Sequence, residues 1–209
     1  NKVAEWNRSV NDGTVTECVD KVNESSVETV AERPGQAKIT GLAQGSYILH
    51  EEAAPAGYEM ASDIAFTLGK DGKLTGNTGI SDDGLTLAMT DTAISLKLRK
   101  LNQDDTEIDQ EKLGYAEFEI KGTFADGSTE KQGITSEGLN SLDGLWIAGE
   151  TYTFAETKAP AGYIRSAQSV ELIFDKDGSL KSVSGDAGAI DQDEKETLLF
   201  KNEPISISV

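Results

Sequence analysis

The chain has 209 residues, of which 37 are acidic and 19 are basic, so its formal net charge is −18 at pH 7. Such a charge repels phosphate backbones and anionic lipid headgroups, which argues against nucleic acid and membrane surfaces as partners. The single cysteine, Cys18, excludes an intramolecular disulfide and a multi-cysteine metal site. The 21 glycines and the many Asn, Asp, Ser and Thr residues indicate a turn-rich, all-β protein.

The sequence contains neither a membrane-span pattern nor a signal-like start. It has no run of about 18 apolar residues. The best candidate for a helix is 25–32, which is short and polar, so we expect strands to dominate.

A long internal repeat organises the chain. The segment GSYILHEEAAPAGY at 45–58 returns as GETYTFAETKAPAGY at 149–163. Each copy is followed by an alternating strand pattern and then by a hairpin signal, at 64–68 with 70–72 and at 170–174 with 177–178. The repeat predicts two homologous domains.

A second correspondence predicts the domain boundaries. The segment DTAISLKL at 91–98 resembles NEPISISV at 202–209. We therefore predict one domain over 1–93 and a second over 94–204, with 205–209 as the start of a following domain or a tail. On this interpretation the parent molecule is a longer tandem array; a chance similarity between two β-rich tails is the alternative.

Alternation along the strands places three polar groups in apolar rows. Lys100 continues the row of Ile94, Leu96 and Leu98; Asn202 continues the row of Leu198 and Phe200; and Glu156 shares a face with Tyr152 and Phe154. Burying a lone lysine or glutamate is costly unless the group is paired or neutralised. Either these groups lie near strand ends and reach water, or they meet inside a sandwich.

If the three groups meet, they can react. Desolvation lowers the pKa of a lysine and raises that of a glutamate, so a buried Lys100 can exist as the free amine and Glu156 as the acid. A neutral amine is a nucleophile, so Lys100 can attack the carboxamide carbon of Asn202. Glu156 would polarise the carbonyl and shuttle protons, ammonia would leave, and an isopeptide bond would tie the first strand to the last.

These residues resemble a known family. The pattern Tyr-x-Phe/Leu-x-Glu-x-x-Ala-Pro-x-Gly-Tyr, present at 47–58 and 152–163, is similar to the signature of the Cna protein B-type (CnaB) domains of Gram-positive pilins and surface adhesins. The segment GYAEFEI at 114–120 is similar to the second core strand of that family, so the resemblance covers nearly all of 94–204.

The resemblance implies an all-β fold of two tandem immunoglobulin-like sandwiches. It also implies autocatalytic Lys–Asn or Lys–Asp isopeptide bonds assisted by the glutamate of the motif. The implied function is structural or adhesive, in a pilin or wall-anchored protein on the bacterial cell surface. That function involves no cofactor and no catalysis beyond one self-cross-linking turnover. The implied partners are neighbouring domains of the array, other pilin subunits or host extracellular matrix.

The first domain fits the same scheme less completely. Glu51 corresponds to Glu156, and Asp91 ends an inward row in the place of Asn202, where an aspartate would form the bond by losing water. Lys2 is the candidate nucleophile by its order along the chain, although no apolar strand precedes it. Lys21 is the alternative.

Two other functions compete with this interpretation. An enzyme would have to use His50, the only histidine, which alternation places opposite Glu51 and toward solvent. A calcium-stabilised sandwich without isopeptide bonds would use 175–179 and the acidic run 186–196. The first of these segments fits a hairpin turn better, and the second fits a solvated loop, so we expect no metal ligands.

A host-ligand-binding adhesin module is the third alternative. Trp6 and Trp146 are the side chains that would make such contacts if they were exposed. A tryptophan in a small sandwich is more often part of the core, and we expect that for both.

Overall fold

The computed structural model describes residues 26–29, 37–167, 169–184, 188–191, 193–194 and 196–207. Its contacts divide the chain into two compact units. Unit 1 consists of 1–51 and 61–90, and unit 2 consists of 52–60 and 91–209. Lys2, Trp6, Cys18 and Lys21 lie outside the described residues.

Unit 1 contains two small antiparallel sheets, β1-β2 and β3-β4-β5. Its strands are β1 (Ser26–Thr29), β2 (Ala37–Thr40), β3 (Gly45–Leu49), β4 (Ile64–Leu68) and β5 (Leu74–Gly76). The turn at Gly72, which has a positive φ of 76°, joins β4 to β5 as the hairpin signal predicted. Half-buried and exposed side chains alternate along β3 and β4, which is typical of strands with one solvated face.

The described part of the best helix candidate is a strand, as the expected dominance of strands implies. Ser26–Thr29 is a strand that pairs with β2, in a register that sets Val27 opposite Ile39. Pairing with a partner farther along the chain outweighs the weak local periodicity of a short polar segment.

Unit 2 contains most of the strands. They are β6 (Lys97–Leu101), β7 (Glu117–Lys121), β8 (Glu130–Thr135), β9 (Thr151–Lys158), β10 (Tyr163–Ile164), β11 (Ser169–Phe174), β12 (Leu180–Ser184), β13 (Gly188–Ile190), β14 (Thr197–Lys201) and β15 (Glu203–Pro204). One turn of helix, α1 (Gln110–Leu113), and a 3-10 helix, η1 (Gly138–Leu142), interrupt them. The Asp109 side chain caps α1 by accepting from the Lys112 amide.

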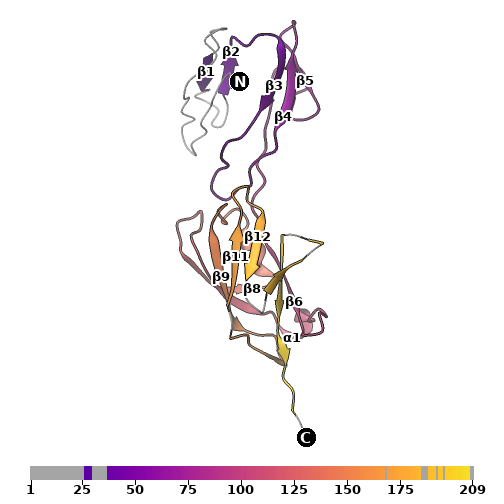
Figure 1. The fold of residues 1–209 in the computed structure, drawn as a ribbon, viewed down its shortest axis with the longest axis vertical. Helices are drawn as coiled ribbons and strands as arrows, with labels where there is room; N and C mark the ends of the chain where they lie inside the picture. The colour runs from indigo at the N-terminus through magenta and orange to yellow at the C-terminus, as the bar shows by residue number, and fades with distance from the viewer. Residues whose placement is uncertain are drawn as a thin grey trace. The chain divides into compact units, whose positions relative to one another are not determined.

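The strands of unit 2 form two principal sheets. One is five-stranded in the order β12-β11-β9-β7-β8, with β9, β11 and β12 visible side by side in Figure 1. The other is three-stranded in the order β13-β14-β6, and a short pair joins β10 to β15. In the three-stranded sheet the first and last long strands, β6 and β14, are parallel neighbours, with Lys100 opposite Phe200. Residues distant in sequence are thereby brought to one place.

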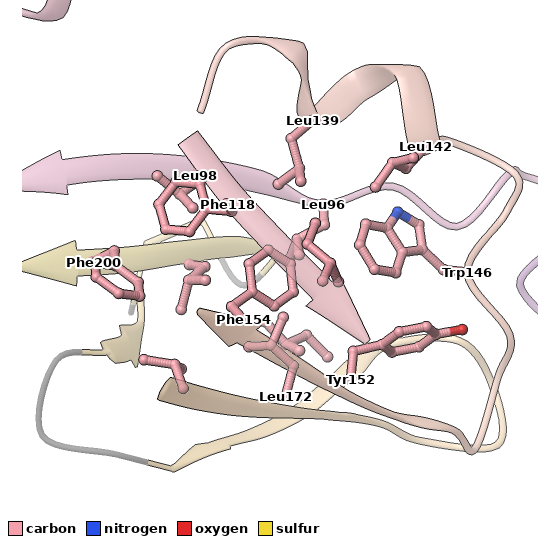
Figure 2. Close-up of a cluster of buried hydrophobic side chains, with 14 of the residues drawn as sticks. Leu96, Leu98, Phe118, Leu139, Leu142, Trp146, Tyr152, Phe154, Leu172 and Phe200 are labelled. Atoms are coloured by element: carbon pink, nitrogen blue, oxygen red, sulfur yellow. The ribbon is translucent and has the colours of Figure 1, made fainter. Parts of the chain in front are cut away.

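The core of unit 2 lies between these sheets. Phe118 on β7 packs edge-on against Phe200 on β14, with ring centroids 5.1 Å apart, so the two sheets share one apolar interior. Figure 2 shows this cluster with Trp146 and Tyr152 at one side of it. Trp146 is fully buried, as the sequence predicted. Its neighbours at one end of the core are aromatic: Phe124, Tyr152, Phe154 and Phe174.

Candidate functional site

Three buried polar side chains meet in the interior of unit 2. Lys100 on β6, Glu156 on β9 and Asn202 directly after β14 are 0 %, 1 % and 3 % exposed. The lysine and the asparagine come from the three-stranded sheet, and the glutamate comes from the five-stranded sheet that faces it. Alternation predicted that each points inward, and each does.

Glu156 contacts both of the other side chains. Lys100 Nζ donates to Glu156 Oε1 at 2.9 Å, and Asn202 Nδ2 donates to Glu156 Oε2 at 2.7 Å. One carboxyl group therefore bridges the amine and the carboxamide, one oxygen to each.

Backbone groups fix the orientation of the glutamate and the asparagine. Ser166 N donates to Glu156 Oε2 at 2.8 Å, and Ile164 O accepts from Asn202 Nδ2 at 2.9 Å. Asn202 N donates to Leu101 O at 2.9 Å, which keeps Asn202 beside β6. Among the described residues, the buried Asn202 Oδ1 has no hydrogen-bond partner.

Aromatic rings keep water from the amine. Lys100 Nζ lies 4.1 Å from the centroid of the Phe200 ring and 5.6 Å from that of Phe118. Burial lowers the pKa of Lys100 from 10.5 to about 8, because the loss of hydration disfavours the ammonium more than the Glu156 carboxylate favours it. A substantial share of this lysine can thus be neutral near physiological pH.

Phe118, the Ile164 carbonyl and the Ser166 amide were not predicted as parts of the site. Phe118 belongs to an apolar row of β7, and the sequence pattern does not indicate which residues lie opposite that row across the core. The two backbone groups carry no sequence signal, because their position depends on the pairing of β10 with β15, which sets Ile164 opposite Glu203.

Of the three candidate residues of the first domain, the structure describes Glu51 and Asp91. Glu51 is half-buried in unit 1, where its Oε2 accepts from Ala61 N at 2.6 Å. Asp91 is half-buried and belongs to unit 2, and Lys2 lies outside the described residues. The first-domain bond therefore stays a prediction.

Two of the residues that the competing functions would use, His50 and Asp177, are exposed. His50 is exposed, and its Nδ1 lies 2.6 Å from Asp63 Oδ1. Asp177 accepts from Ser179 within the β11–β12 turn, which Gly178 completes with a φ of 92°. The described part of the chain holds no group of three or more His, Cys, Asp or Glu residues that could bind a metal ion.

The fold and the site together define a class: a β-sandwich domain with a buried lysine, glutamate and asparagine linking its two sheets. A family model described as the SpaA prealbumin-like fold domain matches residues 5–82 and again residues 94–188. The two matches cover most of the sequence, so the chain belongs to this family and contains two copies of its domain. The resemblance to CnaB-type domains and the prediction of two tandem immunoglobulin-like sandwiches are confirmed.

Several solved structures are similar to this chain. They include the C-terminal fragment of the pilus adhesin SpaC from Lactobacillus rhamnosus GG, with 20% identity over 83% of both chains and a TM-score of 0.40. The shaft pilin SpaA from the same organism is 15% identical, with 83% of this chain and 73% of that chain covered and a TM-score of 0.29. The sequence matches no curated protein. Within the described residues, no helix has the length and apolarity needed to cross a membrane.

Proposed function

We propose that unit 2 cross-links itself through an isopeptide bond between Lys100 and Asn202. The neutral Lys100 amine attacks Asn202 Cγ, the new Nζ–Cγ bond forms, and the Cγ–Nδ2 bond breaks to release ammonia. Glu156 takes the proton that the amine loses and delivers it to the departing nitrogen, so it acts first as base and then as acid. Atoms balance with no other reactant.

The observation that carries this proposal is the bridging position of Glu156. Its two oxygens contact Lys100 Nζ and Asn202 Nδ2 at 2.9 and 2.7 Å, so the nucleophile and the leaving group share one proton carrier. The dry surroundings strengthen the same contacts and disfavour the ammonium. Held this closely, the groups need no diffusion to meet, which is the largest advantage an enclosed reaction offers.

The position of the bond explains its use. Lys100 on β6 lies near the start of the sandwich, and Asn202, directly after the parallel neighbour β14, lies near its end. A pull applied to the two ends passes through the bond and leaves the strands between them unloaded. A cross-link that closes a loop of this length also disfavours the unfolded chain by about 4–5 kcal/mol, by analogy with disulfides.

The same chemistry is proposed for the first copy of the domain, between Lys2 and Asp91 with Glu51 as the proton carrier. Water would leave in place of ammonia. Glu51 supports this assignment through its contact with Ala61 N, since Ala61 corresponds in the repeat to Ser166, whose amide contacts Glu156.

These bonds suit a load-bearing segment of a Gram-positive cell-surface protein or pilin. Family membership and the two tandem sandwiches support this role, and the strongly acidic surface suits an extracellular, solvent-exposed stalk. Neighbouring domains of a tandem array and other pilin subunits are the proposed partners. Binding of host extracellular matrix is the second candidate, because the structural neighbours include a pilus adhesin.

The test is the intact mass of the purified chain. We expect the loss of one ammonia for unit 2, and the further loss of one water if the Asp91 bond forms. Glu156→Ala should restore the ammonia and lower the melting temperature. Glu171→Ala, which changes an exposed carboxylate on β11, should do neither. A wild-type mass equal to the sum of its residues would contradict the proposal.

A further inference from the structure

The two copies of the repeated segment make the same backbone contacts with the strand that follows them. In the first copy, Gly57 O accepts from Ile94 N at 2.9 Å, and Tyr58 forms an antiparallel bridge with Ala93. In the second copy, Gly162 O accepts from Ile205 N at 2.8 Å, and the preceding residue of that strand, Pro204, pairs with Tyr163. Each copy thus presents the same pair of extended segments.

The surroundings of the two glycines differ. Both have a positive φ, 94° at Gly57 and 87° at Gly162. A Cβ atom added at Gly57 would lie 2.0 Å from the carbonyl oxygen of Gly144, so the two backbones are in close contact within unit 2. A Cβ added at Gly162 would meet none of the described atoms within 4 Å. The first glycine is packed, and the second is open.

A second loop of unit 2 also holds the first copy. Met60 N donates to Asp177 O at 3.1 Å, and a Cβ at Gly178 would lie 2.9 Å from Glu59 Cγ. The Gly144 loop and the Asp177–Gly178 turn, called here the receiving loops, therefore enclose the end of the first copy. The turn depends on Gly178, because a Cβ there would lie 3.0 Å from Ile94 Cγ1, and the Gly144 loop depends on glycine through its positive φ of 76°.

The apolar residues beyond the second copy are exposed where their counterparts are buried. Ile94 and Leu96 are 0 % and 2 % exposed, whereas Ile205 and Ile207, which occupy the same places in the repeat, are 61 % and 87 % exposed. Ile164 beside them is 50 % exposed. Exposed aliphatic side chains thus lie on both of the segments that pair beside the open glycine, where the first copy has buried ones.

We propose that Gly162 and Ile164 form a docking surface for a further sandwich of the same kind, whose core Ile205 and Ile207 would enter as Ile94 and Leu96 enter that of unit 2. Residues 205–207 would be the first strand of that sandwich, and its own receiving loops would enclose Gly162 as Gly144 and Asp177 enclose the first copy. The proposal rests on the tandem-array part of the proposed function. Beyond that function, it identifies the surface of unit 2 that a following sandwich would contact.

The test is an extended chain in which residues 97–204 follow directly after Ile207, so that Ile205 and Ile207 take the places of Ile94 and Leu96. Arg165 corresponds in the repeat to Met60, whose amide is held by Asp177. With only the first 207 residues isotopically labelled, we expect the Arg165 amide to exchange about tenfold or more slowly in the extended chain than in the 209-residue chain.

Two glycine variants make the test specific. Gly162→Ala should abolish the added protection of Arg165 in the extended chain and leave its exchange in the 209-residue chain unchanged. Gly127→Ala is the matched control: it also has a positive φ, 81°, and no described atom within 4 Å of an added Cβ. Its backbone strain is comparable, so it should not affect Arg165 in either chain.

Equal exchange of Arg165 in the two chains would overturn the proposal. Protection that appears in the 209-residue chain and rises with protein concentration would overturn the choice of occupant, because a second chain would then cover the surface. The intact mass of the same samples reports ammonia loss separately. The extended chain contains the Lys100–Asn202 pair twice, so two ammonia molecules should be lost. If both are lost but Arg165 is not protected, the proposed function stands and the docking surface fails. If Arg165 is protected but no ammonia is lost, the docking surface stands and the proposed bond fails.

Discussion

The glutamate of the repeated motif lies in two environments, Glu51 in unit 1 and Glu156 in unit 2. The contrast separates what the motif fixes from what its surroundings supply. In both copies the glutamate accepts a hydrogen bond from the amide ten residues later: Glu51 from Ala61 at 2.6 Å and Glu156 from Ser166 at 2.8 Å. Glu51 is nevertheless half-buried, whereas Glu156 is 1 % exposed. The motif positions the carboxyl group, and the opposite sheet desolvates it.

Desolvation in unit 2 comes from residues outside the motif. Phe118 and Phe200 enclose the Lys100 amine, and both are fully buried. In the described part of unit 1, no hydrophobic side chain is buried to that degree, although Tyr47 and Phe66 stack at 5.6 Å. Similar motif residues can thus have different reactivity, because the pKa of an amine depends on its hydration more than on its neighbours in sequence.

The largest effect is expected when the bond of unit 2 is prevented without disturbing the strands. Asn202→Ala removes the electrophile, so no ammonia should be lost and the mass should equal the sum of the residues. Unit 2 should lose about 4–5 kcal/mol of unfolding free energy, by analogy with a disulfide loop of that length. Urea denaturation followed through Trp146 fluorescence would measure the loss. The control Asn140→Ala alters an exposed asparagine of η1 and should leave both mass and stability unchanged.

The same variant, Asn202→Ala, should also differ from the wild type in how its stability depends on pH. In Asn202→Ala the lysine stays titratable, with a folded pKa of about 8 against 10.5 for the unfolded chain. Between these values the unfolded chain binds more protons, so stability should increase with pH, by about 3 kcal/mol in total. In the wild type, the proposed bond would make Lys100 an amide, which does not titrate. A parallel rise in both proteins would show that the effect comes from other groups.

A smaller effect is expected from the tyrosine that begins each motif. Tyr152 OH accepts from Ile147 N at 2.8 Å and donates to Thr123 O at 2.6 Å, and burial raises its pKa to about 12, so it stays a donor. Tyr152→Phe leaves both backbone groups unpaired and should cost about 1–3 kcal/mol. Thermal unfolding would measure the difference.

Tyr47 is the matched residue in unit 1. Its hydroxyl donates to Ala43 O at 2.6 Å on a surface that water can reach. Tyr47→Phe should therefore change stability by no more than about 0.5 kcal/mol. Equal costs at the two positions would mean that their environments are more similar than the structure indicates.

Much of the fold followed from local pattern. The alternation of 64–68 and 170–174 corresponds to β4 and β11, and the turn signals correspond to the hairpins at Gly72 and Gly178. Such patterns succeed because the side-chain period of a strand and the φ of a glycine turn are local properties. The local pattern did not identify the strand Ser26–Thr29, because a short polar segment has little alternation and its pairing with β2 depends on a more distant part of the chain.

The sequence by itself placed Lys100, Glu156 and Asn202 on the strand faces that carry apolar rows, because side chains alternate with a period of two. It also determined the two-domain repeat. Only the tertiary structure decided that these three side chains meet, since the parallel pairing of β6 with β14 and the facing position of β9 depend on contacts across the whole sandwich. It likewise decided which of two equivalent glycines is enclosed, because a close backbone contact arises from packing, which no single segment encodes.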